Sequence, residues 1–146
     1  MIDFVVKKWE KNKEKLENYF LKTAQADFAY DYHCLVRRVI DIILNDDDYS
    51  YDKGCQHYKF ETNDIAVIDY GDYQGTQIFI FHYDTYQPSP RDTFYTSVYY
   101  GSCSGCDTLL RINEYSTDKK PTEEQVKDYM ILSLHLIQNI NTFKEN

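Results

Sequence analysis

The sequence predicts a single α+β domain in which an antiparallel four-stranded meander packs with two N-terminal helices and one C-terminal helix. Three observations predict this fold. The first part of the chain carries apolar side chains at helical spacing, the middle changes to an alternation of period two among β-forming residues, and the end returns to helical spacing. Because 146 residues is the size of one ordinary domain, we expect residues 1–146 to fold as one.

The N-terminal part is expected to form two helices. In the first, apolar residues from Ile2 to Phe20 recur mostly at helical spacing among lysines and glutamates. In the second, the apolar stripe runs from Phe28 to Ile43, with Asp27 as its N-cap. The polar run at residues 45–48 is expected to end this helix.

The strands are expected between these helices and the C-terminal one. The candidates are His57 to Glu61, Ile65 to Tyr70, Thr76 to Tyr83 and Phe94 to Tyr100. Turn clusters at residues 62–64 and 71–75 join the first three, and a longer connection with two prolines leads to the fourth. Adjacent strands with short turns indicate an antiparallel meander.

The last helix is expected to begin at Thr122, which forms a capping box with Gln125. The residues expected to make its buried stripe are Val126, Met130, Leu134 and Ile137, widened by Ile131, Leu132 and Leu136. So wide a stripe predicts a helix that is largely buried against the sheet.

The charge and the termini limit the class of protein. The net charge is −8, with 24 acidic and 16 basic residues, which argues against direct binding of nucleic acid and favours either a basic partner or simple solubility. No segment reaches the roughly 18 apolar residues of a membrane helix, and the N-terminus lacks the order of a signal peptide. We therefore expect a cytoplasmic protein whose four cysteines are thiols or metal ligands.

Cys103 and Cys106 form a CxxC pair directly after the last expected strand. Two thiolates at this spacing can bind one tetrahedral ion, and Gly105 allows the tight turn between them. We interpret the pair as half of a structural zinc site, with Zn²⁺ as the cofactor. A redox dithiol, with Asp107 capping the helix that follows, and a pair of inert thiols are the alternatives.

Two sets of residues could complete the zinc site. The first set is Cys55 and His57. The strand that begins near His57 and the strand that ends at Tyr100 are expected to meet the same end of the sheet, so Cys55 and His57 share that end with Cys103 and Cys106. His135 is the second, since an imidazole inside an otherwise apolar helix needs a partner on each ring nitrogen. A core histidine bonded to a backbone carbonyl is the alternative for His135.

The other cysteine and histidine of interest are not expected to bind metal. Cys34 shares a side with the apolar stripe of the second helix and is expected to be a buried thiol. His82 is expected to be exposed or paired at the far end of its strand. Catalysis is not expected either, because four protein ligands leave zinc no open position and no HExxH, P-loop, GxSxG or GxGxxG motif occurs.

The 15 tyrosines indicate a docking surface. Tyr95, Tyr99, Tyr73 and Asp72 are the candidate partner-binding residues, because rigid amphipathic rings among acidic groups suit a protein interface. The alternative is a tyrosine-rich sheet that packs under helices.

Three segments resemble a family of small phage and prophage proteins, and YGSCSGCDTL is the most specific part of the resemblance. The segments are residues 72–76, 99–109 and 133–138. Within this setting the chain is similar to zinc-containing anti-CRISPR inhibitors of type II RNA-guided nucleases. The resemblance implies a protein that binds a basic host nuclease and blocks its DNA loading or activity, and it places His135 in a shared segment. A thiol redox protein or small metalloenzyme, and a zinc-stapled phage structural or assembly protein, are the alternatives.

Overall fold

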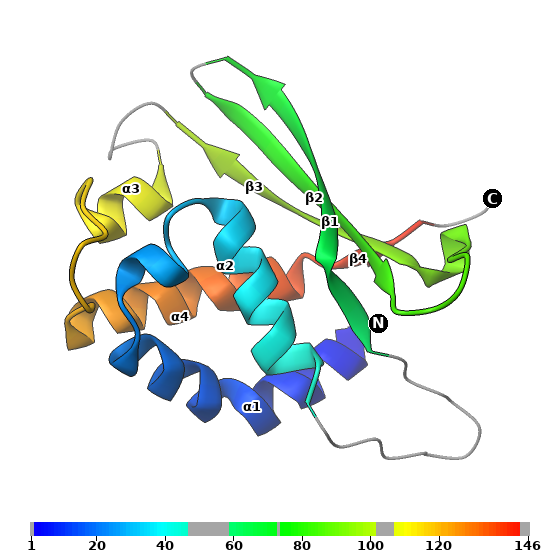
Figure 1. Cartoon of the computed structure of the whole chain (residues 1–146), viewed down its shortest axis with the longest axis horizontal. Helices are drawn as coiled ribbons and strands as arrows, with labels where there is room; N and C mark the ends of the chain where they lie inside the picture. Colours follow the sequence, from blue (N-terminus) through cyan, green and yellow to red (C-terminus); the bar gives the residue numbers. More distant parts are fainter. Residues whose placement is uncertain (1, 47–58, 73, 102–106, 144–146) are drawn as a thin grey trace.

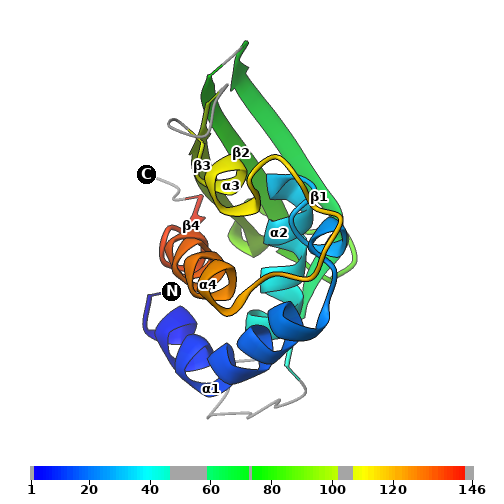
Figure 2. The ribbon, with the colours of Figure 1, turned by 90° about the vertical axis from the view of Figure 1, so that its left-hand side faces the viewer.

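The computed structural model describes residues 2–46, 59–72, 74–101 and 107–143. Its helices gather on one side of a four-stranded antiparallel sheet (Figure 1), and Figure 2, viewed from the helix side, shows α2 and α3 in front of the strands. The elements are α1 (Ile2–Lys22), α2 (Tyr32–Val39), β1 (Phe60–Gly71), β2 (Gly75–Tyr83), β3 (Thr93–Tyr100), α3 (Thr108–Asn113), α4 (Glu123–Gln138) and β4 (Asn141–Thr142). The sheet order β1-β2-β3-β4 confirms the predicted α+β fold with an antiparallel meander.

The N-terminal helices follow their apolar stripes. The buried residues of α1 recur every three or four positions, so one face of the helix packs against the core. Asp31, not the predicted Asp27, caps α2, because its carboxylate accepts a hydrogen bond from the backbone N–H of Cys34 at 2.8 Å. Asp27 lies in a separate 3₁₀ turn, Gln25–Asp27. Beyond α2 the chain continues as a π-helical turn, Ile40–Leu44.

The strands differ from the sequence prediction at both ends of the sheet. The first two predicted strands are a single strand, β1, because residues 62–64 do not turn the chain. Instead, the register with β2 shifts between Glu61 and Ala66, as in a β-bulge. The fourth strand comes from the end of the chain, where Asn141 and Thr142 of β4 pair with β3.

The hairpin between β1 and β2 depends on two glycines. Gly71 has a φ of +147°, which side chains rarely allow, and a Cβ atom there would clash with the carbonyl oxygen of Gln74. A Cβ atom on Gly75 would clash with the carbonyl oxygen of Tyr70. The tip of this hairpin extends beyond the helices (Figure 1).

The hydrophobic core lies between the helices and one sheet face. Phe28 and Tyr129 pack edge to face with their ring centroids 5.1 Å apart, and Phe79 of β2 is fully buried on the same side. The predicted capping box of α4 is confirmed. The predicted width of its buried stripe is wrong, because Ile131 is 56% exposed. In the described part of the chain, no helix has the length and apolar character needed to cross a bilayer.

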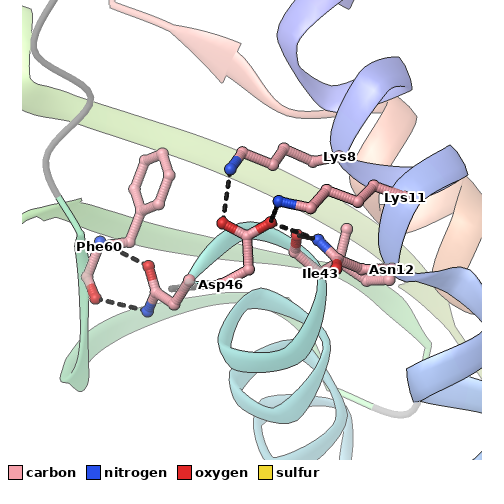
Figure 3. A network of polar contacts seen from close by, with 7 residues as sticks. Lys8, Lys11, Asn12, Ile43, Asp46 and Phe60 are labelled. Atoms are coloured by element: carbon pink, nitrogen blue, oxygen red, sulfur yellow. Dashed lines mark hydrogen bonds and ion pairs between the residues drawn. The ribbon is translucent and has the colours of Figure 1, made fainter. Parts of the chain in front are cut away.

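A polar network joins α1 to the end of the π-helical turn (Figure 3). Asp46 accepts hydrogen bonds from the side chains of Lys8 at 2.6 Å and Asn12 at 2.8 Å, and its carboxylate lies 3.1 Å from the Lys11 ammonium. Next to it, the amide of Asn45 donates to the carbonyl of Phe60 and accepts from the N–H of the same residue. The network thus ties α1 and the start of β1 to the same turn.

Candidate protein-binding face

The sheet face opposite the helices carries apolar side chains. Successive side chains of a strand point to opposite faces, and Phe79 of β2 is fully buried toward the helices. Its neighbours Ile78 and Ile80 therefore point away from the helices. The register continues this face onto the adjacent strands, because Ile68 lies opposite Ile78 and Tyr95 lies opposite Ile80.

Seven apolar and aromatic side chains make up this surface, which we call the open sheet face. They are Ile68, Tyr70, Ile78, Ile80, Tyr95, Tyr99 and Phe143. A groove of about 550 Å³ runs between Ile68 on β1 and Phe143 after β4. The ring of Phe143 packs on that of Tyr95 at a centroid distance of 5.1 Å, and both side chains line the groove.

The structure brings two of the four predicted partner-binding residues together. Tyr95 and Tyr99 lie on the open sheet face, where Tyr99 is 54% exposed and Tyr95 is half-buried. Asp72 is exposed in the turn of the β1–β2 hairpin, and Tyr73 lies outside the described residues. All four remain predictions as binding residues.

Sequence reasoning missed the aliphatic part of the open sheet face. The signal was present in β2, where Ile78 and Ile80 alternate with Phe79 and Phe81 and make both faces apolar. A strand that is apolar on both faces needs a cover on each. Phe143 could not be found this way, because its place beside Tyr95 depends on the pairing of β4 with β3.

Tyr100, a near neighbour of Tyr99, lies on the other sheet face. Its hydroxyl donates to Asp69 at 2.5 Å, and the carbonyl oxygen of Gly71 lies 3.1 Å from the same hydroxyl oxygen. The hydrogen bond to the Asp69 carboxylate raises the pKa of Tyr100 to about 12. Gln77 also donates to Asp69, so this carboxylate is held on β1 by two side chains.

The sheet region is strongly acidic. Residues 60–101 contain six carboxylates and a single arginine, Arg91. The carboxylates are Glu61, Asp64, Asp69, Asp72, Asp84 and Asp92. The open sheet face is therefore an apolar surface within an anionic part of the molecule.

The loop that carries Cys103 and Cys106 lies outside the described residues, but both of its ends are described. Asp107 is buried and accepts hydrogen bonds from the backbone N–H of Gly101 at 3.2 Å and from the hydroxyl of Tyr32 at 2.6 Å. Burial, together with the bond to Asp107, raises the pKa of Tyr32. Asp107 also caps α3, the helix that the redox alternative placed after the cysteine pair and that the predicted fold did not include. One carboxylate thus joins the end of β3, the start of α3 and helix α2.

Cys55 and His57 lie outside the described residues, but the predicted strand order that put them at the same sheet end as this loop is wrong. Because β1 is a single strand, its first residue, Phe60, pairs with Tyr83 at the end of the sheet opposite to Gly71. Tyr100 pairs with Gly75, at the hairpin end. The two segments therefore join the sheet at opposite ends.

His135 is not the buried histidine that its apolar neighbours suggested. It lies in the last turn of α4 and is exposed, because it faces away from the stripe that contains Leu132 and Leu136. Figure 1 shows α3 beside the first half of α4, away from this last turn. Burial therefore gives no support to the prediction that His135 binds metal.

The remaining cysteine and histidine have ordinary surroundings. Cys34 is half-buried, less than predicted, and burial raises the pKa of its thiol. His82 is paired, as predicted, with one ring nitrogen 2.7 Å from the carbonyl of Tyr83 and the other 3.4 Å from Asp64. Among the residues that the structure describes, no three acidic, histidine or cysteine side chains gather as metal ligands. Zinc binding stays a prediction.

Comparisons with protein-family models, with curated proteins and with solved structures found no match. The resemblance to phage inhibitors therefore stays a prediction as well.

Proposed function

We propose that this chain is an inhibitor that binds a basic host protein through its open sheet face, and that it has no catalytic activity. One observation carries the proposal: a contiguous apolar and aromatic surface that no described helix covers. Contiguous apolar patches with a polar rim are typical of interaction sites. Tyrosines at such a patch supply contact area at little cost in conformational entropy.

Charge indicates the kind of partner. Six carboxylates in the sheet region would repel nucleic-acid phosphates. A protein surface with lysines and arginines around an apolar centre would instead complement both the charge and the groove. The acidic side chains would mainly accelerate association, and the apolar centre would provide most of the affinity.

The partner that the sequence resemblance implies is a type II RNA-guided nuclease. Such an enzyme holds its nucleic acid along positively charged channels. An acidic surface with an apolar centre can compete for such a channel and prevent the loading of target DNA. This identification rests on the resemblance, whereas the binding surface rests on the geometry of the sheet.

Binding to a guide-loaded type II effector nuclease tests the proposal. The two proteins are expected to elute together in size-exclusion chromatography, and the chain is expected to inhibit DNA cleavage. Ile78→Lys puts a charge in the middle of the open sheet face and is expected to weaken binding about 30-fold, as the loss of a central contact does. Rising salt is expected to slow association.

The matched control is Ile131→Lys, the same substitution at an exposed isoleucine of α4. It is expected to leave binding unchanged, and circular dichroism of both variants checks that they fold. Equal losses in the two variants would place the contact elsewhere on the molecule. Absence of any complex with the nuclease would refute this choice of partner.

A further inference from the structure

The edge of β1 is covered along only half of its length. β1 is an edge strand of the sheet, and side chains from α2 and the following turn bond to its first half, up to Ile65. The contacts are Asn45 with the backbone of Phe60, Asp41 with Thr62, Arg37 with Asn63, and His33 with the carbonyl of Ile65. From Ala66 onward these contacts stop.

The second half of β1 is exposed and regular. Every residue from Ala66 to Gly71 pairs in register with β2, and every one is exposed. The apolar side chains of Val67 and Ile68 are 42% and 44% exposed. This half belongs to the part of the hairpin that extends beyond the helices (Figure 1). An edge of this kind presents unpaired backbone N–H and C=O groups on which another strand can pair.

We propose that the edge of β1 from Ala66 to Gly71 takes up an extended segment of the basic partner as an additional β-strand. The inference rests on the proposed function and names the way in which the partner binds. Main-chain hydrogen bonds would hold the added strand, and its side chains would select the sequence. The added strand would also widen the open sheet face, to which Ile68 and Tyr70 already belong.

The two faces of β1 define the sequence that fits. Ile68 lies on the open sheet face, so the partner residue beside it is apolar. Asp69 lies on the opposite face, where Tyr100 and Gln77 hold its carboxylate. A carboxylate has room for about four hydrogen bonds, so it can also accept one from a lysine or arginine. The partner segment therefore alternates an apolar residue beside Ile68 with a basic residue beside Asp69.

A second copy of this chain fits the edge poorly. Asp64, Asp69 and Asp72 lie along or next to it, and each chain has a net charge of −8. Pairing two such edges would bring carboxylates near one another, and like charges across strands are destabilising. Charge complementarity thus favours a basic segment over self-association.

The test is titration of the ¹⁵N-labelled full chain with an acetylated and amidated octapeptide of alternating valine and lysine. We expect the amide signals of Ala66 to Gly71 to shift, and a valine–glutamate peptide to bind at least about tenfold more weakly. Asp69→Lys is expected to weaken binding of the lysine peptide about tenfold, whereas Asp118→Lys, the same substitution at an exposed site between α3 and α4, is expected to leave it unchanged. Asp69→Asn separates the loss of charge from the loss of the Tyr100 contact.

Backbone methylation separates strand addition from simple charge attraction. Alternate N–H groups of a strand point to opposite edges, and an added strand bonds to β1 through only one of them. N-methylation of one residue type, either all valines or all lysines, is therefore expected to abolish binding. The peptide that is methylated at the other residue type is expected to bind. Equal binding of the two methylated peptides, or shifts outside β1, would overturn the inference, and so would a doubled mass in light scattering caused by β1 pairing between copies.

If the nuclease complex depends on Ile78 but the peptide shifts no β1 amide, only this inference fails. If the peptide binds β1 and the nuclease does not bind, the choice of partner fails.

Discussion

Asp46 makes a quantitative prediction about acid stability. Its side chain is only 3% exposed, and burial alone would raise the pKa of its carboxyl group. The hydrogen bonds from Asn12, Lys8 and Lys11 outweigh burial and lower the pKa to about 2 from an ordinary value of 3.8. Because each pKa unit corresponds to about 1.4 kcal/mol, the ionised carboxylate stabilises the fold by about 2–3 kcal/mol at neutral pH.

The sign of the pH dependence follows from this lowered pKa. The folded protein holds the proton of Asp46 less tightly than the unfolded chain does, so the stabilisation is present above the unfolded pKa of about 4. It is lost as the pH falls from about 4 toward 2. Asp46→Asn is therefore expected to lower the free energy of unfolding by about 2–3 kcal/mol at pH 7 and to come within about 0.5 kcal/mol of the wild type at pH 2.

Urea unfolding at several pH values measures this difference. Asp118→Asn, at an exposed carboxylate, is the control and is expected to change the free energy of unfolding by less than about 0.5 kcal/mol. The quantity of interest is the difference between wild type and variant at each pH. A difference that persists unchanged at pH 2, or one no larger than that of the control at pH 7, would refute the reasoning.

Two further predictions concern the loop between β3 and α3. Tyr32→Phe is expected to destabilise the fold by about 1–3 kcal/mol in urea unfolding, because it removes a donor to buried Asp107 and the acceptor for the N–H of Leu109. Tyr30→Phe, at a tyrosine that is 73% exposed, is expected to have no effect, and equal losses would contradict this explanation. Elemental analysis is expected to find one zinc per chain that is lost in Cys103→Ser and kept in Cys34→Ser. Metal-free protein with an unchanged melting temperature would contradict the zinc prediction, and insulin reduction that depends on Cys103 would favour the redox alternative.

Features that depend on neighbouring residues could be predicted from the sequence. The capping box of Thr122 and Gln125 and the cap formed by Asp107 involve hydrogen bonds over three residues, so the local sequence is enough to predict them. The apolar period of α1 and the alternation in β2 likewise reflect one face of a single element. One local prediction failed at Asp27, where a 3₁₀ turn precedes the true cap, Asp31.

The features that define the candidate site depend on contacts between distant segments. Residues 62–64 look like a turn, but pairing of both halves of β1 with β2 keeps the strand continuous and leaves only a bulge. This continuity, rather than any local signal, puts the start of β1 and the end of β3 at opposite ends of the sheet. The rotation of α4 on the core exposes His135, although its sequence neighbours are apolar.

The sequence by itself determined the fold class, most helix caps, the acidic character and the abundance of tyrosine. Only the tertiary structure decided which apolar side chains gather on a sheet face that no described helix covers. Their position depends on strand register and on which sheet face the helices occupy. Ile68 and Phe143 are 75 residues apart, yet both line one groove because β1, β2, β3 and β4 pair in order. Local propensity contains no information about such pairings, since their stability comes from burial shared between distant parts of the chain.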